Sequence, residues 1–189
     1  TPAIERRAAT LGTRRSIKKD HQAAWLLRAI SCIDLTTLSG DDTPGRVKRL
    51  CTKAIRPIRP DLTKALGINN LHVGAICVYH EMIETAIASL GNSGIPVAAV
   101  STGFPAGLSP LTTRLLEINE SVLAGAKEID IVISRRHVLT QNWQELFNEV
   151  KAFRSACGEA HLKTILATGE LGSLRNVARA SICLLYTSP

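Results

Sequence analysis

Five short apolar runs recur along the chain, and they constrain its fold more than any other feature. They are rich in Ile and Val and span residues 30–35, 73–79, 97–102, 128–133 and 162–167. Near-continuous apolar strands are typical of parallel sheets, because both faces of such sheets are covered. Helical patterns lie between the runs, and they include 45–55, 82–90 and 111–122. This alternation predicts right-handed strand–helix–strand units and an α/β fold.

Two architectures fit five such units: an open doubly wound sheet, or part of a (β/α)8 barrel. A nucleotide-binding doubly wound sheet usually carries a GxGxxG or GxxxxGK[ST] motif after its first strand. The sequence has neither motif. A complete barrel takes about 250 residues, whereas this chain has 189. If the chain forms a barrel, we therefore expect only about the first five β/α units of it.

The charge balance leaves the class of partner open. A net charge of +7 suits nucleic acid or phosphorylated ligands, and six basic residues fall within 1–20. We interpret residues 1–28 as a helical arm, with a nucleic-acid-binding arm as the alternative. Aromatic residues make up only 4% of the chain, which argues against a base-stacking surface. We expect no nucleic-acid partner.

The sequence shows no signal for a membrane-spanning segment, a secretory leader or a metal site. The uncharged run 66–80 is too short and polar to cross a bilayer, and no signal peptide is recognisable. The five cysteines form no CxxC pair, which favours reduced thiols and a cytoplasmic location. The histidines show no metal-ligand spacing, so we expect no metal site.

Polar side chains inside the apolar runs are the strongest candidates for function, because an apolar residue would be cheaper there. They are Asp34, Cys77, Asp130 and Lys163. Strand side chains alternate between faces, so Asp130 faces away from the side shared by Ile129, Ile131 and Ile133, which we expect to be the helix side. Structural alternatives remain: an Asp130–Lys163 ion pair, a strand-end turn at Asp34, and a core thiol at Cys77.

Five segments in order resemble the deoxyribose-phosphate aldolase family. They are Ile-Asp-Leu-Thr-Thr-Leu at 33–38, Ala-Ile-Cys-Val-Tyr at 75–79, Gly-Phe-Pro-Ala-Gly at 103–107, Glu-Ile-Asp-Ile-Val-Ile at 128–133 and Leu-Lys-Thr-Ile-Leu-Ala-Thr-Gly-Glu-Leu at 162–171. The resemblance covers about residues 15–180. It implies a (β/α)8-barrel class I aldolase of the cytoplasm that takes a small phosphorylated sugar and needs no cofactor. The implied reaction cleaves 2-deoxy-D-ribose 5-phosphate reversibly to D-glyceraldehyde 3-phosphate and acetaldehyde through a lysine Schiff base, in deoxyribose phosphate catabolism.

The resemblance also implies roles for single residues. Asp130 matches the proton-relay aspartate and is the candidate catalytic residue. Four further residues match positions that line the substrate pocket: Asp34, Thr36, Cys77 and Lys163. Ser134 stands where relatives often have Asn. The oligomeric state is not predicted.

The family's Schiff-base lysine lies in a Lys-Thr-Ser-Thr-Gly motif that this sequence lacks. We therefore expect a partial barrel domain at 1–181 that is inactive alone. Residues 182–189 depart from the family, and we interpret them as a non-native or frame-shifted tail. The alternative hypotheses are another barrel aldolase that uses Lys163 as the imine former, and a basic phosphate- or RNA-binding protein.

Overall fold

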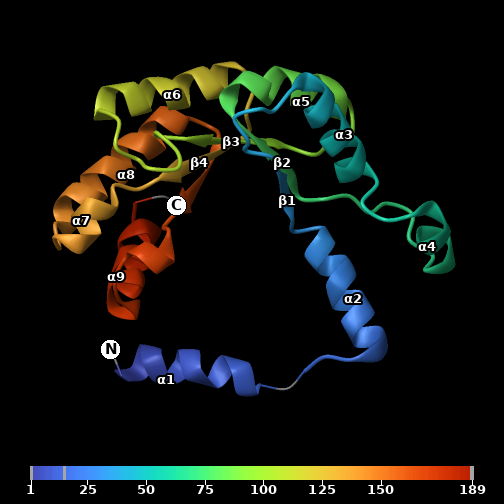
Figure 1. The fold of residues 1–189 in the computed structure, drawn as a ribbon, viewed down its shortest axis with the longest axis horizontal. Coiled ribbons are helices and arrows are strands. Elements are labelled where there is room, and N and C mark those ends of the chain that lie inside the picture. The colour runs from blue at the N-terminus through green and yellow to red at the C-terminus, as the bar shows by residue number, and fades with distance from the viewer. Residues whose placement is uncertain (1, 15, 188–189) are drawn as a thin grey trace. The chain divides into compact units, whose positions relative to one another are not determined.

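The computed structural model describes residues 2–14 and 16–187, and its centre is a five-stranded sheet. The strands are β1 (Asp34–Thr36), β2 (Ala75–Val78), β3 (Val97–Ser101), β4 (Glu128–Val132) and β5 (His161–Ile165). Their order in the sheet is the order of the chain, as Figure 1 shows. Each strand is followed along the chain by helix, which is the arrangement of consecutive β/α units. The predicted α/β fold with five units is confirmed.

Helices connect and flank these strands. They are α1 (Pro2–Thr10), α2 (Lys19–Ile30), α3 (Pro44–Ile55), α4 (Pro60–Ala65), α5 (Ile83–Leu90), α6 (Leu111–Leu123), α7 (Arg135–Leu139), α8 (Trp143–Cys157) and α9 (Leu174–Leu185). Short 3-10 turns occur at Leu11–Thr13, His80–Met82 and Thr168–Glu170. Helix α1 and all but the last two residues of α2 lie in the segment interpreted as an arm, and neither helix buries a residue. Residues 188 and 189 of the predicted tail lie outside the described residues.

The chain divides into two compact units, which are described separately below. The α3 unit comprises Ile17–Val100 and Glu120–Ile129. The α8 unit comprises Thr1–Ser16, Ser101–Asn119 and Asp130–Pro189.

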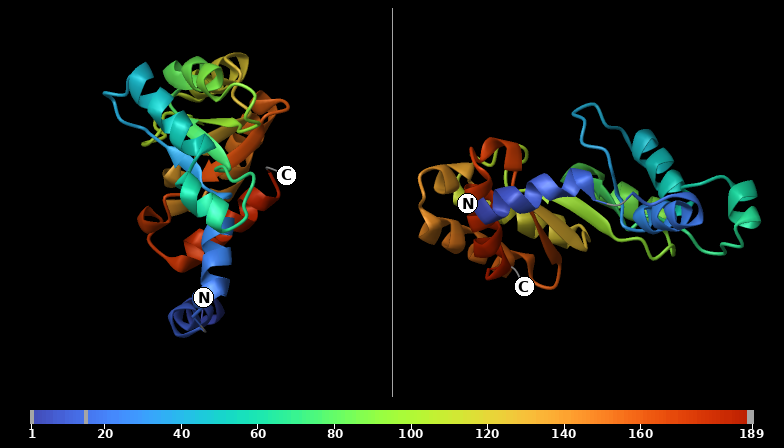
Figure 2. Two further views of the ribbon diagram at one scale, coloured as in Figure 1. Left: turned by 90° about the vertical axis from the view of Figure 1, so that its right-hand side faces the viewer. Right: turned by 90° about the horizontal axis from the view of Figure 1, so that it is seen from below.

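In the α3 unit, helices α3 and α5 lie side by side over parallel strands β1, β2 and β3 (Figure 2). Helix α3 begins where the side chain of Thr43 accepts a hydrogen bond from the N–H of Arg46, and Pro44 starts its first turn. Val47, Cys51 and Ala54 then recur at helical spacing and are fully buried. This stripe packs α3 into the core, and the burial of Val47 alone contributes about 1.5–3 kcal/mol.

In the α8 unit, helix α8 carries the core. The side chain of Asn142 caps its start by accepting a hydrogen bond from the N–H of Glu145. Leu146, Val150, Phe153 and Cys157 form one buried stripe on this helix. Helix α9 packs beside α8, and its own buried residues are Ala180 and Leu184.

The structure corrects the predicted limits of the first and last strands. Ile30 ends helix α2, and β1 begins only at Asp34, because the N–H groups of Cys32 and Ile33 bond back to the carbonyls of Ala29 and Ile30. Asp34 therefore starts its strand instead of ending it. Strand β5 stops at Ile165, shortly before Ala167 takes a left-handed backbone with φ 50°.

Gly107 offers a test of packing in the α8 unit. Its φ is +70°, and a Cβ atom there would lie 3.1 Å from Val132 Cγ1 and 3.2 Å from the carbonyl oxygen of Ile133. We expect Gly107→Ala to lower the free energy of unfolding by about 1–3 kcal/mol, because alanine is strained at positive φ and would displace the end of β4. Urea unfolding measures the change.

The matched control is Gly40→Ala, because a Cβ atom on Gly40 meets nothing within 4 Å. We expect this variant to unfold at nearly the wild-type urea concentration. Equal midpoints for the Gly107 and Gly40 variants would contradict the close packing of Gly107.

Candidate functional site

Asp130 of β4 and Lys163 of the neighbouring strand β5 form an ion pair, and both residues belong to the α8 unit. The Nζ atom of Lys163 lies 3.0 Å from Oδ1 of Asp130, and the side chains are 29% and 14% exposed. Ile131 and Ile133, which alternate with Asp130 and Val132 along the chain, are fully buried. Alternation along β4 thus separates a charged position from apolar neighbours, as the sequence predicts.

A proton can pass between these two groups, because the carboxylate lies within hydrogen-bond distance of the ammonium group. A lysine in such a place can also attack a carbonyl carbon once it is neutral. A purely structural ion pair would have the same short contact. The geometry is therefore compatible with catalysis, and the role of each residue stays a prediction.

The other predicted site residues lie in the α3 unit. Thr36 of β1 and Cys77 of β2 are register partners, and Asp34 is the partner of Ala75. Partners in a parallel ladder share a face, and so do residues two apart on one strand. Asp34, Thr36 and Cys77 consequently share one face of the β1–β2 pair. Cys77 is only 3% exposed.

A charged loop that the sequence did not predict follows β1. Arg46 Nη1 lies 2.8 Å from Oδ1 of Asp41 and 3.1 Å from Oδ1 of Asp42. Hydrogen bonds from Arg46 and Ser39 lower the pKa of Asp41 to about 2. Burial acts to raise the pKa of Asp42, but hydrogen bonds, the strongest from Thr37, hold it below its ordinary value. These contacts fix the loop directly after Thr36.

A buried polar cluster in the α8 unit also escaped prediction. Arg114 of α6 lies 2.7 Å from Oε1 of Glu149 on α8, and both side chains are 5% exposed. Ser134, just after β4, donates its backbone N–H to Oε2 of Glu149 at 2.9 Å. The guanidinium of Arg114 also lies over the ring of Phe153. The cluster therefore ties two helices to the carboxyl end of the strand that carries Asp130.

The sequence held a signal for this cluster. Arg114 lies on the same helical face as Leu111 and Ile118, and Glu149 falls within the buried stripe of Leu146 and Phe153. A charge at a buried helical position needs a partner, as a charge within a strand does.

Thr102 joins the ends of β3 and β4. It is fully buried and has a left-handed backbone with φ 62°, which is unusual for a β-branched residue. Its hydroxyl accepts a hydrogen bond from the N–H of Val132 at 2.7 Å and lies 3.0 Å from the carbonyl oxygen of the same residue. Strained residues of this kind persist where surrounding contacts hold them, often at functional sites.

The described residues hold no group of three or more His, Cys, Asp or Glu side chains that could bind a metal ion. No helix among them has the length and apolar character needed to cross a membrane.

A five-stranded parallel sheet whose strands follow the order of the chain, each with a helix after it, is the arrangement of consecutive units of a β/α barrel. The family model for DeoC/LacD family aldolases matches residues 28–179. The chain belongs to this family, as the sequence resemblance predicts.

Curated relatives are deoxyribose-phosphate aldolases. The Bos taurus enzyme is 56% identical over 185 residues, which are 96% of this chain and 58% of the relative. The Mus musculus enzyme is 58% identical over 184 residues, with 95% of this chain and 58% of the relative covered. A putative deoxyribose-phosphate aldolase of Caenorhabditis elegans is 46% identical over 82% of this chain. The chain thus spans 58% of the length of the mammalian relatives it matches.

Solved structures support the fold. A putative deoxyribose-phosphate aldolase from Coccidioides immitis matches with a TM-score of 0.73 and 21% identity, over 98% of this chain and 67% of that one. The tetrameric aldolase from Aeropyrum pernix matches with a TM-score of 0.65 and 21% identity, over 83% of this chain and 59% of that one. The prediction of a (β/α)8 barrel represented by five of its units is confirmed.

Removing the charge of Glu149 tests the buried cluster. We expect Glu149→Gln to lower the free energy of unfolding by about 3–5 kcal/mol, because it leaves the buried guanidinium of Arg114 without its counter-ion. Glu145→Gln removes an exposed charge from the same helix and should change stability by less than about 0.5 kcal/mol. Thermal melts of both variants that coincide with the wild type would show that the pair does not stabilise the fold.

Proposed function

We propose that the whole protein containing this chain is a deoxyribose-phosphate aldolase. It splits 2-deoxy-D-ribose 5-phosphate reversibly into D-glyceraldehyde 3-phosphate and acetaldehyde, within deoxyribose phosphate catabolism in the cytoplasm. Membership of the aldolase family supports this proposal. The single structural observation that carries it is the 3.0 Å contact between Asp130 and Lys163 on neighbouring strands.

The chemistry assigns each group a task. A lysine amine adds to the C1 aldehyde of the sugar phosphate and loses water, which gives an iminium. The 3-hydroxyl then loses its proton, the C2–C3 bond breaks, and its electron pair enters the iminium to form an enamine. Protonation at C2 and hydrolysis release acetaldehyde and restore the amine.

In this proposal Asp130 moves protons, and Lys163 holds the Asp130 carboxylate in place while its charge favours neutrality of a nearby amine. Asp34, Thr36 and Cys77 line the substrate pocket. The imine-forming lysine belongs to the Lys-Thr-Ser-Thr-Gly motif of the family, so the 189-residue chain alone is expected to be inactive.

Borohydride trapping tests the whole assignment. The whole protein is incubated with 2-deoxy-D-ribose 5-phosphate, reduced, digested and mapped by mass spectrometry, and cleavage is assayed in parallel. Modification within a Lys-Thr-Ser-Thr-Gly motif, together with acetaldehyde release, supports the proposal. Modification at Lys163 would instead favour the alternative aldolase in which Lys163 forms the imine.

Asp130→Asn separates catalysis from structure, because it keeps the side chain's shape and removes its basic oxygen. We expect turnover to fall by about 10²–10⁴-fold while imine trapping stays detectable, as for a lost acid–base group. The exposed Glu159→Gln is the control and should keep its activity. Melting temperature is measured on the same samples. Near wild-type turnover in a destabilised Asp130→Asn protein would make Asp130 only a structural partner of Lys163.

Cys77 should line the pocket without taking part in bond making. In the whole protein, Cys77→Ala should keep most of the turnover, and a bulky thiol reagent should inhibit the Cys77 form more than the variant. The Cys77 form and the Cys77→Ala variant both also carry Cys32→Ala, because Cys32 is an exposed thiol that would otherwise react with the reagent. Complete loss of turnover in a folded Cys77→Ala protein would give Cys77 a chemical role.

A further inference from the structure

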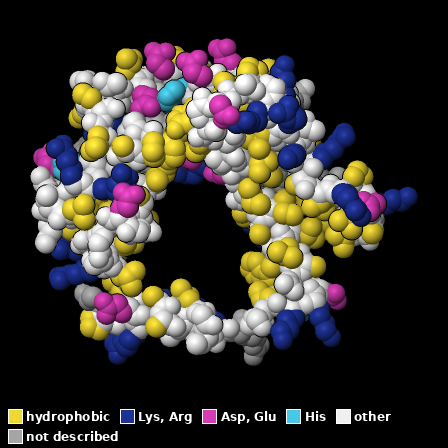
Figure 3. Space-filling view, in the orientation of Figure 1, with side chains coloured by type: hydrophobic (Ala, Val, Ile, Leu, Met, Phe, Trp, Pro, Cys, Tyr) yellow, Lys and Arg dark blue, Asp and Glu magenta, His cyan; other side chains and the backbone are white. Residues whose placement is uncertain are grey.

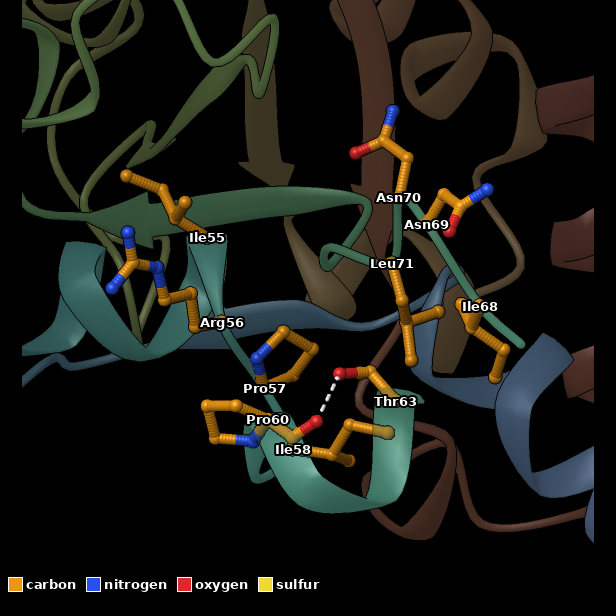
Figure 4. Close-up of a pocket in the computed structure, with 10 residues that line it drawn as sticks. All are labelled: Ile55, Arg56, Pro57, Ile58, Pro60, Thr63, Ile68, Asn69, Asn70 and Leu71. Carbon is orange, nitrogen blue, oxygen red and sulfur yellow. Dashed lines mark hydrogen bonds between the residues drawn. The ribbon is translucent and has the colours of Figure 1, made fainter. Parts of the chain in front are cut away.

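A groove with a volume of about 420 Å³ lies within the α3 unit and contains none of the predicted site residues. Figure 4 shows apolar side chains of Pro57, Ile58, Ile68 and Leu71 gathered around its centre. The walls come from the end of α3, from α4 and from the segment that leads toward β2. The remaining lining residues are Ile55, Arg56, Pro60, Thr63, Asn69 and Asn70.

This groove and the proposed pocket lie at opposite ends of the strands. Residues 55–71 precede β2 and approach its amino end, whereas Thr36 and Cys77 are near the carboxyl ends of β1 and β2. Barrel enzymes place their chemistry at the carboxyl ends of the strands. The groove is therefore separate from the proposed reaction.

Three polar side chains on the groove make no side-chain hydrogen bond or ion pair within 2–14 and 16–187: those of Arg56, Asn69 and Asn70. All three residues are exposed, and in Figure 4 their polar ends point away from the apolar centre. A guanidinium binds a carboxylate well, and amide groups both donate to and accept from a peptide backbone. The rim can thus bind groups that the apolar floor cannot.

The surface around the groove is basic and apolar together. Lys64 of α4 and Arg59 just before α4 are exposed, as is Lys53 in the last turn of α3, and Asp61 of α4 pairs with Arg59 at 2.7 Å. Leu62 and Leu66 on and next to α4 are 44% and 52% exposed. Figure 3 shows hydrophobic, basic and acidic side chains gathered over α4. Charge complementarity therefore calls for an acidic partner with apolar side chains.

We propose that this groove binds a peptide segment of a partner protein in which acidic residues flank a large apolar residue. The apolar side chain enters the cavity among Ile58, Ile68 and Leu71, and a carboxylate pairs with Arg56. Asn69 and Asn70 bind the peptide backbone. The exposed leucines and lysines extend the surface beyond what one small molecule would cover.

The same basic surface does not favour nucleic acid. Single-stranded nucleic acid needs aromatic side chains on which bases stack, and none of the lining residues is aromatic. The apolar floor has no counterpart on a phosphate backbone, but it suits a leucine or phenylalanine side chain.

The test is a selection from a random 16-residue peptide display library on the whole protein, without substrate. We expect enriched peptides to combine Asp or Glu with Leu, Ile or Phe. Fluorescence anisotropy of the best synthetic peptide should show at least about tenfold weaker binding to Arg56→Glu and to Ile58→Ser. As controls, Arg28→Glu repeats the charge reversal and Leu123→Ser replaces another large apolar residue by serine. Both lie at exposed positions of the α3 unit outside the groove and should bind as the wild type does.

Arg56 is exposed, so its variant remains informative if Ile58→Ser fails to fold. Four outcomes overturn the proposal: no enriched peptide, enriched peptides without acidic residues, equal binding by Arg56→Glu, and displacement of the peptide by a single-stranded oligonucleotide at physiological salt. A dimer in sedimentation that Ile58→Ser dissociates would also overturn it, because a second copy would then fill the groove. Aldolase activity takes no part in these readouts, so failure here leaves the proposed reaction untouched.

Discussion

Strands β2 and β3 are buried at every residue and β4 is buried at Ile129, Ile131 and Val132, and this burial restricts where polar chemistry can occur. Each charge within a strand must find a partner, because an unpaired charge is costly away from water. Asp130 meets the requirement through Lys163 on the next strand. At the ends of β3 and β4, the hydroxyl of Thr102 accepts a hydrogen bond from the N–H of Val132. The N–H of Ser134 donates to the buried carboxylate of Glu149. The polar groups of the α8 unit thus follow from the apolar character of its strands.

The same reasoning explains what the sequence could predict. The Ile- and Val-rich runs located all five strands, because few other structures accept such short continuous apolar segments. The run at 30–35 predicted the start of the first strand wrongly, because Ile30 fits the last turn of an amphipathic helix as well as the start of a strand. Asp130 stood out because it interrupts isoleucines. Its contact with Lys163 was foreseeable, because consecutive strands of a β/α series lie side by side.

Other parts of the site depend on information that residue type alone does not carry. Arg114 and Glu149 are 35 residues apart and meet only after two helices have packed. Each lies on a buried helical face, so a search for charges at helical spacing would have indicated both. The contacts of Arg46 with Asp41 and Asp42 arise from the path of a loop. That path is held by hydrogen bonds within the loop, such as the one from Thr37 to Asp42, and no pattern of residue types predicts them.

The loop between β3 and α6 is held at several points by hydrogen bonds and close packing. The N–H of Gly103 donates to Oε2 of Glu117 at 2.7 Å, and Gly107 fits against Val132 without room for a side chain. Between them, Arg135 donates to the carbonyl oxygen of Pro105 at 3.2 Å. Apart from Gly107, the side chains of this loop can therefore be changed more readily than the length of the loop. An inserted residue would have to break one of these attachments, and the end of β4 would lose its cover.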